Sequence, residues 1–209
     1  MWYSFLQLWA RMFCAVYFKI RVIGRENVPV TGPAILASNH QSYMDPPFVG
    51  VGLNRQIHFM ARKSLFERFF LFTWLIRSLN AFPVERDRGD VGAMKEILRR
   101  LQGGAAIVVF PEGTRTVTGE IGALKPGLFR IAARAGVAVV PTVIDGAFES
   151  WPRWSIYPRP YPVIVAFGKQ VRPEDYSNDA DSMAAACKQE MLSLQSKIHY
   201  MRKGICCNA

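Results

Sequence analysis

His40 and Asp45 carry side chains that could act together as a general base and its partner. They closely follow a hydrophobic run at residues 34–38. An unperturbed imidazole titrates at about pH 6.5 and can take a proton from a hydroxyl near neutrality. An adjacent carboxylate would hold its tautomer and stabilise the imidazolium that forms. Because positions five apart do not share one face of a helix, we expect a turn that folds Asp45 back towards His40.

Asp45 also has a purely structural interpretation. Asp followed by Pro46 is typical of the N-cap and first residue of a helix, here predicted over residues 46–53. The two roles are compatible, because one carboxylate oxygen can cap the helix while the other orients the imidazole.

A second polar segment, Phe-Pro-Glu-Gly-Thr-Arg at residues 110–115, ends another hydrophobic run. Proline second and glycine fourth are typical of a type I turn, in which Glu112 and Arg115 could form nothing more than an ion pair. Alternatively, Arg115 offers a planar fork for a phosphate, and Glu112 positions that arginine or a polyol hydroxyl. Arg86, in a charged run at residues 85–88, has the same ambiguity between a phosphate ligand and a solvated loop.

Composition and charge narrow the possible partners. A net charge of +10 calls for an anionic partner, and nucleic acid and an anionic membrane surface are the usual candidates. Hydrophobic residues make up 50% of the chain, and no helix-turn-helix or zinc pattern is present, so we expect a membrane surface and no nucleic acid. The cysteines form no Cys-x-x-Cys pair, which argues against a metal site. The glycine motif at residues 50–55 is incomplete, which argues against a nucleotide cofactor.

Short hydrophobic runs alternate with helical patterns along the chain. The runs predict strands at residues 19–23, 34–38, 56–61, 105–110, 137–144 and 163–167, with a further short strand just before Arg86. Besides residues 46–53, helices are predicted at residues 64–79, 90–101, 126–135 and 180–201, the first of them with a capping box of Ser64 and Glu67. This alternation predicts an α/β layered domain with a largely parallel sheet flanked by helices. Ligands of such sheets gather outside the carboxyl ends of the strands, where both polar segments lie.

The N-terminal residues 1–18 are crowded with aromatic and aliphatic side chains. Ser4, Gln7 and Arg11 recur at helical spacing and make a narrow polar stripe. This pattern favours a helix that lies in the membrane interface, although a helix covering the protein's own core would share it. We therefore divide the chain into a membrane-docking helix at 1–18 and one domain at 19–209. The aromatic and arginine-rich residues 151–161 are a second candidate for interfacial contact, or a plain connection.

The motifs occur in a recognisable order. His-x4-Asp comes first. It is followed by Pro-Val-x-Arg, which ends at Arg86, then Phe-Pro-Glu-Gly-Thr-Arg, which ends at Arg115, and then Val-Pro, which ends at Pro141. With this order the chain resembles the 1-acyl-sn-glycerol-3-phosphate acyltransferase family over residues 22–167. The resemblance implies a glycerol-3-phosphate acyltransferase-like fold and an N-terminal helix that docks on the membrane.

The resemblance also implies roles for individual residues. His40 would deprotonate the acceptor hydroxyl with Asp45 as its partner, and Pro141 would help to shape the acyl site. Binding of the acceptor's glycerol-phosphate part is implied for Lys63, Arg86, Glu112, Gly113, Thr114 and Arg115. The implied substrates are a lysophospholipid acceptor and an acyl thioester of coenzyme A or acyl carrier protein, used as a co-substrate with no further cofactor. The implied location is the cytoplasmic face of a membrane.

The expected reaction is direct transfer to the sn-2 hydroxyl of 1-acylglycerol-3-phosphate. An acyl-enzyme would need an activated nucleophile, and the sequence has no Gly-x-Ser-x-Gly motif. The negative intermediate would need backbone N–H donors, for which the start of the helix at residues 46–53 is the candidate. Two alternatives stay open: another lysolipid acceptor, such as a lyso-ornithine lipid, and a non-catalytic peripheral lipid-binding protein.

Overall fold

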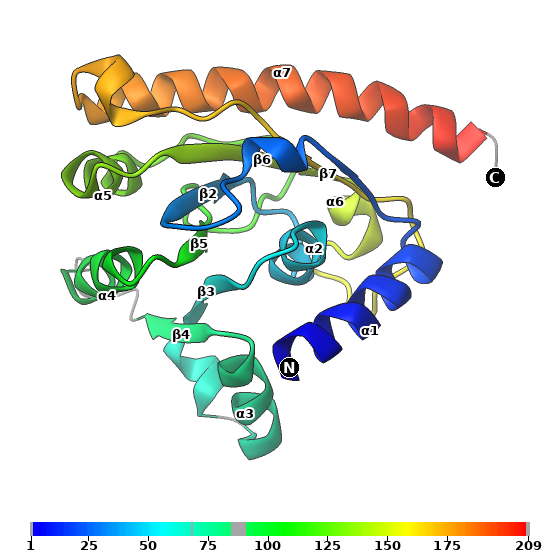
Figure 1. Ribbon diagram of the computed structural model, residues 1–209. Coiled ribbons are helices and arrows are strands. Elements are labelled where there is room, and N and C mark those ends of the chain that lie inside the picture. Colours follow the sequence, from blue (N-terminus) through cyan, green and yellow to red (C-terminus); the bar gives the residue numbers. More distant parts are fainter. Residues whose placement is uncertain (1, 68, 85–90, 208–209) are drawn as a thin grey trace.

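The computed structural model describes residues 2–67, 69–84 and 91–207 of the chain (Figure 1). Its strands form one sheet in the order β1-β7-β6-β2-β5-β3-β4. Neighbouring strands run parallel, except that β6 and β7 are antiparallel. The strands are β1 (Arg21–Ile23), β2 (Ala34–Ser38), β3 (Ile57–Arg62), β4 (Ala81–Val84), β5 (Ala106–Val109), β6 (Val139–Asp145) and β7 (Ile164–Phe167).

Helices cover both faces of this sheet. One face packs against α1 (Trp2–Tyr17) and α2 (Asp45–Gly52). The other packs against α4 (Val91–Gln102), α5 (Gly127–Ala135) and α7 (Ala180–Cys207). The remaining helices are α3 (Phe70–Ser78), α6 (Ala147–Ser150), η1 (Arg25–Asn27), η2 (Lys63–Phe66) and η3 (Pro173–Tyr176).

Strand β2 shows how the core is divided between the two faces. Ile35 and Ala37 belong to the cluster beneath α4, α5 and α7, whereas Ala34 and Leu36 belong to the cluster beneath α1 and α2. Every residue of β2 is buried, which is why the strand reads as a continuous hydrophobic run. The predicted α/β class with a largely parallel sheet is confirmed.

The predicted helix at residues 64–79 is correct only in its second half, and the capping box at its start is wrong. Residues 63–66 form the 3-10 helix η2, in which Ser64 makes no capping bond, and α3 begins only at Phe70. This segment connects two parallel strands, with Phe59 paired to Ala81 and Arg62 to Val84. It must therefore travel back only about 13 Å, the length of four strand residues. A helix over residues 64–79 would rise about 24 Å, whereas one of the length of α3 rises about 13 Å.

Helix α1 turns Gln7 and Arg11 of its polar stripe towards the protein, whereas Ser4 is exposed. Gln7 Nε2 donates hydrogen bonds of 2.8 Å to the carbonyls of Gly50 and Leu53, and Arg11 Nε donates one of 3.0 Å to the carbonyl of Val51. These bonds satisfy carbonyls at the C-terminal end of α2. Within the described residues, no helix is both long enough and apolar enough to cross a bilayer.

Candidate functional site

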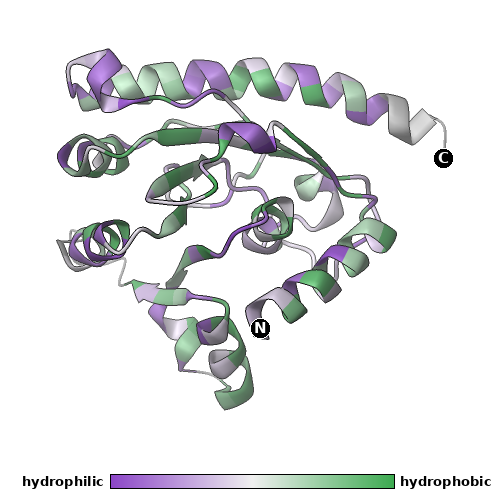
Figure 2. Ribbon diagram, viewed as in Figure 1, coloured by the Kyte–Doolittle hydropathy of each residue, from purple (hydrophilic) through white to green (hydrophobic). Residues whose placement is uncertain are grey.

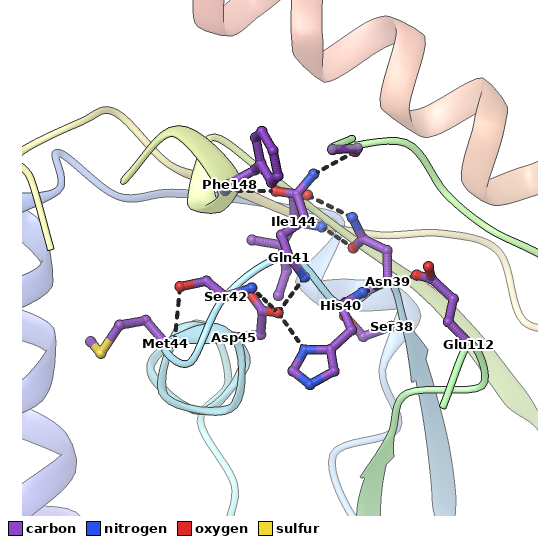
Figure 3. A network of polar contacts seen from close by, with 11 residues as sticks. Ser38, Asn39, His40, Gln41, Ser42, Met44, Asp45, Glu112, Ile144 and Phe148 are labelled. Atoms are coloured by element: carbon purple, nitrogen blue, oxygen red, sulfur yellow. Dashed lines mark hydrogen bonds and ion pairs between the residues drawn. The ribbon is translucent and has the colours of Figure 1, made fainter. Parts of the chain in front are cut away.

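His40 and Asp45 meet at the carboxyl end of β2 (Figure 3). His40 lies two residues beyond the strand, and Asp45 is the first residue of α2. The imidazole Nδ1 lies 2.7 Å from Asp45 Oδ2, so the predicted turn is confirmed. Asp45 is completely buried, while the His40 side chain keeps 14% exposure and is within reach of a substrate.

Asp45 does not cap α2, which corrects the expectation of a shared role. The N-cap is Met44, and α2 has no side-chain capping bond. Instead, Asp45 Oδ2 also accepts hydrogen bonds from the backbone N–H groups of Gln41 at 2.6 Å and Ser42 at 2.7 Å. Burial raises the pKa of Asp45, and the bonds from His40 and these two N–H groups act in the opposite direction. With two backbone N–H donors bonded to it, Oδ2 serves as an acceptor.

The loop after β5 holds His40 from the other side. The backbone N–H of His40 donates to Glu112 Oε1 at 3.0 Å, and the backbone N–H of Thr116 donates to the carbonyl of His40 at 2.8 Å. The ring of Phe110 stacks on the imidazole, with centroids 4.1 Å apart. Three contacts therefore attach the loop at residues 110–116 to the residue that carries the imidazole.

Glu112 braces this loop and makes no ion pair with Arg115, so that interpretation is wrong. Its second oxygen, Oε2, accepts a hydrogen bond of 3.1 Å from the backbone N–H of Gly122. Burial raises the pKa of the Glu112 carboxyl. The predicted turn is present, since Gly113 N–H donates to the carbonyl of Phe110 at 3.0 Å. Gly113 has φ +75°, which favours glycine at that position.

Arg115 lies over the ring of Tyr43, with its Cζ 3.5 Å from the ring centroid. Its Nη1 is buried and has no hydrogen-bond partner among the described residues. Sequence reasoning missed Tyr43, although it lies within the segment between His40 and Asp45. No local signal identifies it, because its partner is distant in the sequence.

The other predicted site residues are less closely grouped. Gly113 and the exposed Thr114 lie in the same loop as Glu112. Lys63 begins η2 at the end of β3, and Pro141 lies inside β6 beside Ala37 of β2. Arg86 lies outside the described residues.

Two amides beside His40 join the site to β6 and α6, and sequence reasoning missed both. Asn39 exchanges two hydrogen bonds with the backbone of Ile144, at 2.9 and 2.8 Å. Gln41 Nε2 donates to the carbonyl of Gly119 at 3.0 Å, and its Oε1 accepts from the N–H of Phe148 at 3.2 Å. Their position on either side of His40 was the one available signal.

The start of α2 does not supply the expected N–H donors for an anionic intermediate. Pro46 and Pro47 have no N–H, and the N–H groups of Asp45 and Phe48 bond to the carbonyls of Ser42 and Met44. This expectation is therefore wrong, because a helix that begins Asp-Pro-Pro has its first donors removed or already paired.

Comparisons with known proteins agree on one family. A family model described as Acyltransferase matches residues 19–145. The 1-acyl-sn-glycerol-3-phosphate acyltransferase LPAT1 of Arabidopsis thaliana is 34% identical over 152 residues, which cover 71% of this chain and 42% of that protein. The 1-acyl-sn-glycerol-3-phosphate acyltransferase of Bacillus subtilis is 33% identical over 143 residues, which cover 64% of this chain and 70% of that protein. The chain spans about half the length of the plant and algal relatives that it matches.

A solved structure agrees with these sequence matches. The crystal structure of the 1-acyl-sn-glycerophosphate acyltransferase PlsC from Thermotoga maritima has a TM-score of 0.76 and 26% sequence identity to this chain. The match covers 92% of this chain and 81% of that one.

Proposed function

The chain belongs to the acyltransferase family, and on this basis we propose that it transfers a fatty acyl chain to the sn-2 hydroxyl of 1-acylglycerol-3-phosphate, giving phosphatidic acid. The donor is a thioester of coenzyme A or acyl carrier protein, and no further cofactor takes part. The observation that carries the proposal is the bond of 2.7 Å between His40 Nδ1 and Asp45 Oδ2. Tyr43 of the same loop lies beneath Arg115 of the loop after β5.

The contacts of His40 support a general-base role. Because Asp45 Oδ2 already accepts from two backbone N–H groups, it faces Nδ1 as an acceptor, so Nδ1 carries the hydrogen and Nε2 keeps its lone pair. Nε2 takes the proton of the acceptor hydroxyl as its oxygen forms a bond to the thioester carbonyl carbon. The carbon–sulfur bond then breaks, and the thiolate leaves with the electron pair and receives the proton back from the imidazolium. A thiolate is a good leaving group, since thiols have a pKa of about 8.5.

The contacts of Ser42 do not support a role as a nucleophile activated by His40. Its side chain is completely buried, its N–H bonds to Asp45, and its Oγ accepts a hydrogen bond of 3.2 Å from the N–H of Met44. These contacts support direct transfer between the two substrates.

Arg115 is the proposed anchor for the acceptor's phosphate. Its guanidinium has a buried Nη1 without a partner among the described residues, and such a donor gains most from an anionic oxygen. Glu112 contributes by bracing the loop. Lys63, Arg86, Gly113 and Thr114 remain proposed contacts of the glycerol-phosphate part, and Pro141 remains a proposed contributor to the acyl site.

The apolar surfaces of α1 and α3 support action at a membrane, proposed here as the cytoplasmic face. Trp2 joins the two helices: its ring lies 5.4 Å from that of Trp74, and its Nε1 donates to Ser78 Oγ at 3.1 Å. Both helices carry strongly hydrophobic segments in Figure 2. The net charge of +10 complements an anionic leaflet. The exposed large hydrophobic residues of this surface, the α1/α3 surface, are Trp2, Phe5, Leu8, Trp9, Met12, Phe13, Val16, Phe69, Phe70, Leu71, Phe72 and Trp74.

The test is thiol release by purified protein in detergent, with an acyl-CoA and 1-acylglycerol-3-phosphate, beside a His40→Ala variant. We expect release to need both substrates and to fall roughly a hundredfold to ten-thousandfold in the variant. If nothing is released, acyl carrier protein donors and other lysolipids are tried next. No release with any of these, together with intact vesicle binding, would favour a non-catalytic lipid-binding protein.

A further inference from the structure

Three aromatic and cationic side chains from separate segments contact one another at the site. Arg115 follows β5, Tyr43 lies between β2 and α2, and Trp151 follows α6. The Arg115 Cζ lies 3.5 Å from the Tyr43 ring centroid, and the Tyr43 and Trp151 rings lie 5.5 Å apart at 55°. Tyr43 thus contacts both a guanidinium and an indole.

This arrangement restricts the orientation of the guanidinium. A free arginine side chain has several rotatable bonds, and a cation–π contact over the ring limits the conformations that they take. Contact over the face of Tyr43 leaves the N–H groups of Arg115, including the buried Nη1, available for hydrogen bonds. Tyr43 itself donates and accepts no hydrogen bond among the described contacts, so its ring face is its main link to the site.

The same stack is attached to the catalytic base. Tyr43 lies three residues after His40, and Arg115 lies next to Thr116, whose N–H bonds to the carbonyl of His40 at 2.8 Å. Glu112 in the same loop accepts the bond from the N–H of His40. Whatever Arg115 binds is therefore held at a defined position relative to the imidazole.

We propose that Tyr43 is a positioning residue that orients Arg115 for the phosphate of the acceptor and so favours phosphorylated lysolipids over uncharged ones. This inference rests on the proposed function, since it assigns a means of acceptor selection to the same site. Tyr43 touches no reacting atom and acts through the plane of the guanidinium.

The first test compares Tyr43→Phe with Tyr43→Leu. Phenylalanine keeps the aromatic face, whereas leucine removes it at similar bulk. At saturating acyl-CoA, we expect Tyr43→Leu to raise the KM for 1-acylglycerol-3-phosphate roughly three- to thirtyfold. The KM for acyl-CoA and the thermal midpoint should stay near those of the wild type, and Tyr43→Phe should stay within about twofold. Tyr200→Leu, on an exposed side chain of α7, is the matched control.

The second test is a double-mutant cycle with Arg115→Met. If Tyr43 acts through Arg115, Tyr43→Leu adds little once the guanidinium is gone. An equal effect in both backgrounds, or an unchanged acceptor KM in Tyr43→Leu, would overturn the proposal. If Tyr43→Leu does not fold, Tyr43→Met gives the same comparison.

Binding separates this inference from the proposed function. The Kd for 1-acylglycerol-3-phosphate is measured in the His40→Ala background, where no turnover is needed. A Kd raised severalfold by Tyr43→Leu supports the inference even if the wild type releases no thiol, and an unchanged Kd contradicts it. Thiol release by the wild type tests the proposed function alone.

Discussion

The backbone N–H of His40 donates a hydrogen bond of 3.0 Å to Oε1 of Glu112, a residue of another loop. The carboxylate thus holds the main chain of His40, the proposed general base, while Asp45 holds its ring. Because Glu112 Oε2 accepts from Gly122, both of its oxygens are engaged with backbone donors.

Glu112→Gln should weaken both the fold and the activity. Glutamine has a single acceptor oxygen, so its amide NH2 would face one of the two backbone donors. We expect the free energy of unfolding to fall by about 1 to 3 kcal/mol and the rate to fall by up to about a hundredfold. Urea unfolding and the thiol-release assay measure these effects. Glu120→Gln, at an exposed position nearby, is the control, and equal behaviour of the two variants would contradict the bracing role.

Asp45→Asn should separate activity from stability. The amide oxygen of asparagine can take the place of Oδ2 and accept hydrogen bonds from the N–H groups of Gln41 and Ser42. The amide NH2 then takes the place of Oδ1, which has no partner among the described residues. A neutral amide does not stabilise the imidazolium, so kcat should fall roughly a hundredfold to ten-thousandfold. The thermal midpoint should change little. A variant that retains most of the wild-type kcat would show that the Asp45 charge is not needed.

The double variant Phe70→Ser, Leu71→Ser should bind membranes more weakly. Both side chains lie on the α1/α3 surface, exposed at 83% and 77%, so their replacement removes little from the core. Burying such a side chain in an apolar phase contributes about 1.5 to 3 kcal/mol, which predicts a loss of at least roughly tenfold in vesicle affinity. Flotation with phosphatidylglycerol vesicles measures it. The control is Tyr200→Ser, which replaces a side chain on α7 that is as exposed as Phe70. An equal loss in both variants would contradict a specific docking surface.

His58 should make the protein less stable in mild acid. Burial and the charge of Arg100, whose Nη1 lies 2.5 Å from His58 Nδ1, lower the pKa of His58 to about 4. Below about pH 6.5 the unfolded chain binds a proton that the folded protein does not, so stability falls as the pH drops from about 6.5 to about 4 and is unaffected above that range. Because His58 is only partly buried, we expect the loss to be of the order of 1 to 2 kcal/mol.

The variant His58→Gln provides the comparison, since glutamine keeps an acceptor for Arg100 but does not titrate. Its free energy of unfolding should depend less on pH between 7.5 and 5 than that of the wild type. Identical pH dependence in urea unfolding would exclude His58 as the source.

Local pattern was enough to predict the layered fold and the central pair of the site. Strands buried on both faces, such as β2, appear in the sequence as hydrophobic runs, because every side chain must be apolar. His40 and Asp45 lie in one short loop, so their contact depends on few residues. The extent of the helix within residues 64–79 was not predictable in this way, because it depends on where β3 and β4 pair.

Long-range partners were decided by the tertiary structure alone. On α7, Met201 is exposed and Arg202 is only 3% exposed, the reverse of what the hydropathy of the two residues predicts. Both positions follow Ile198 at helical spacing, so periodicity does not separate them. Arg202 is the buried one of the two because its Nε lies 2.5 Å from Asp145 Oδ2 at the end of β6, and a buried guanidinium needs such a partner. Arg115 and Tyr43 meet for the same kind of reason, since a contact between distant segments is set by how the elements pack.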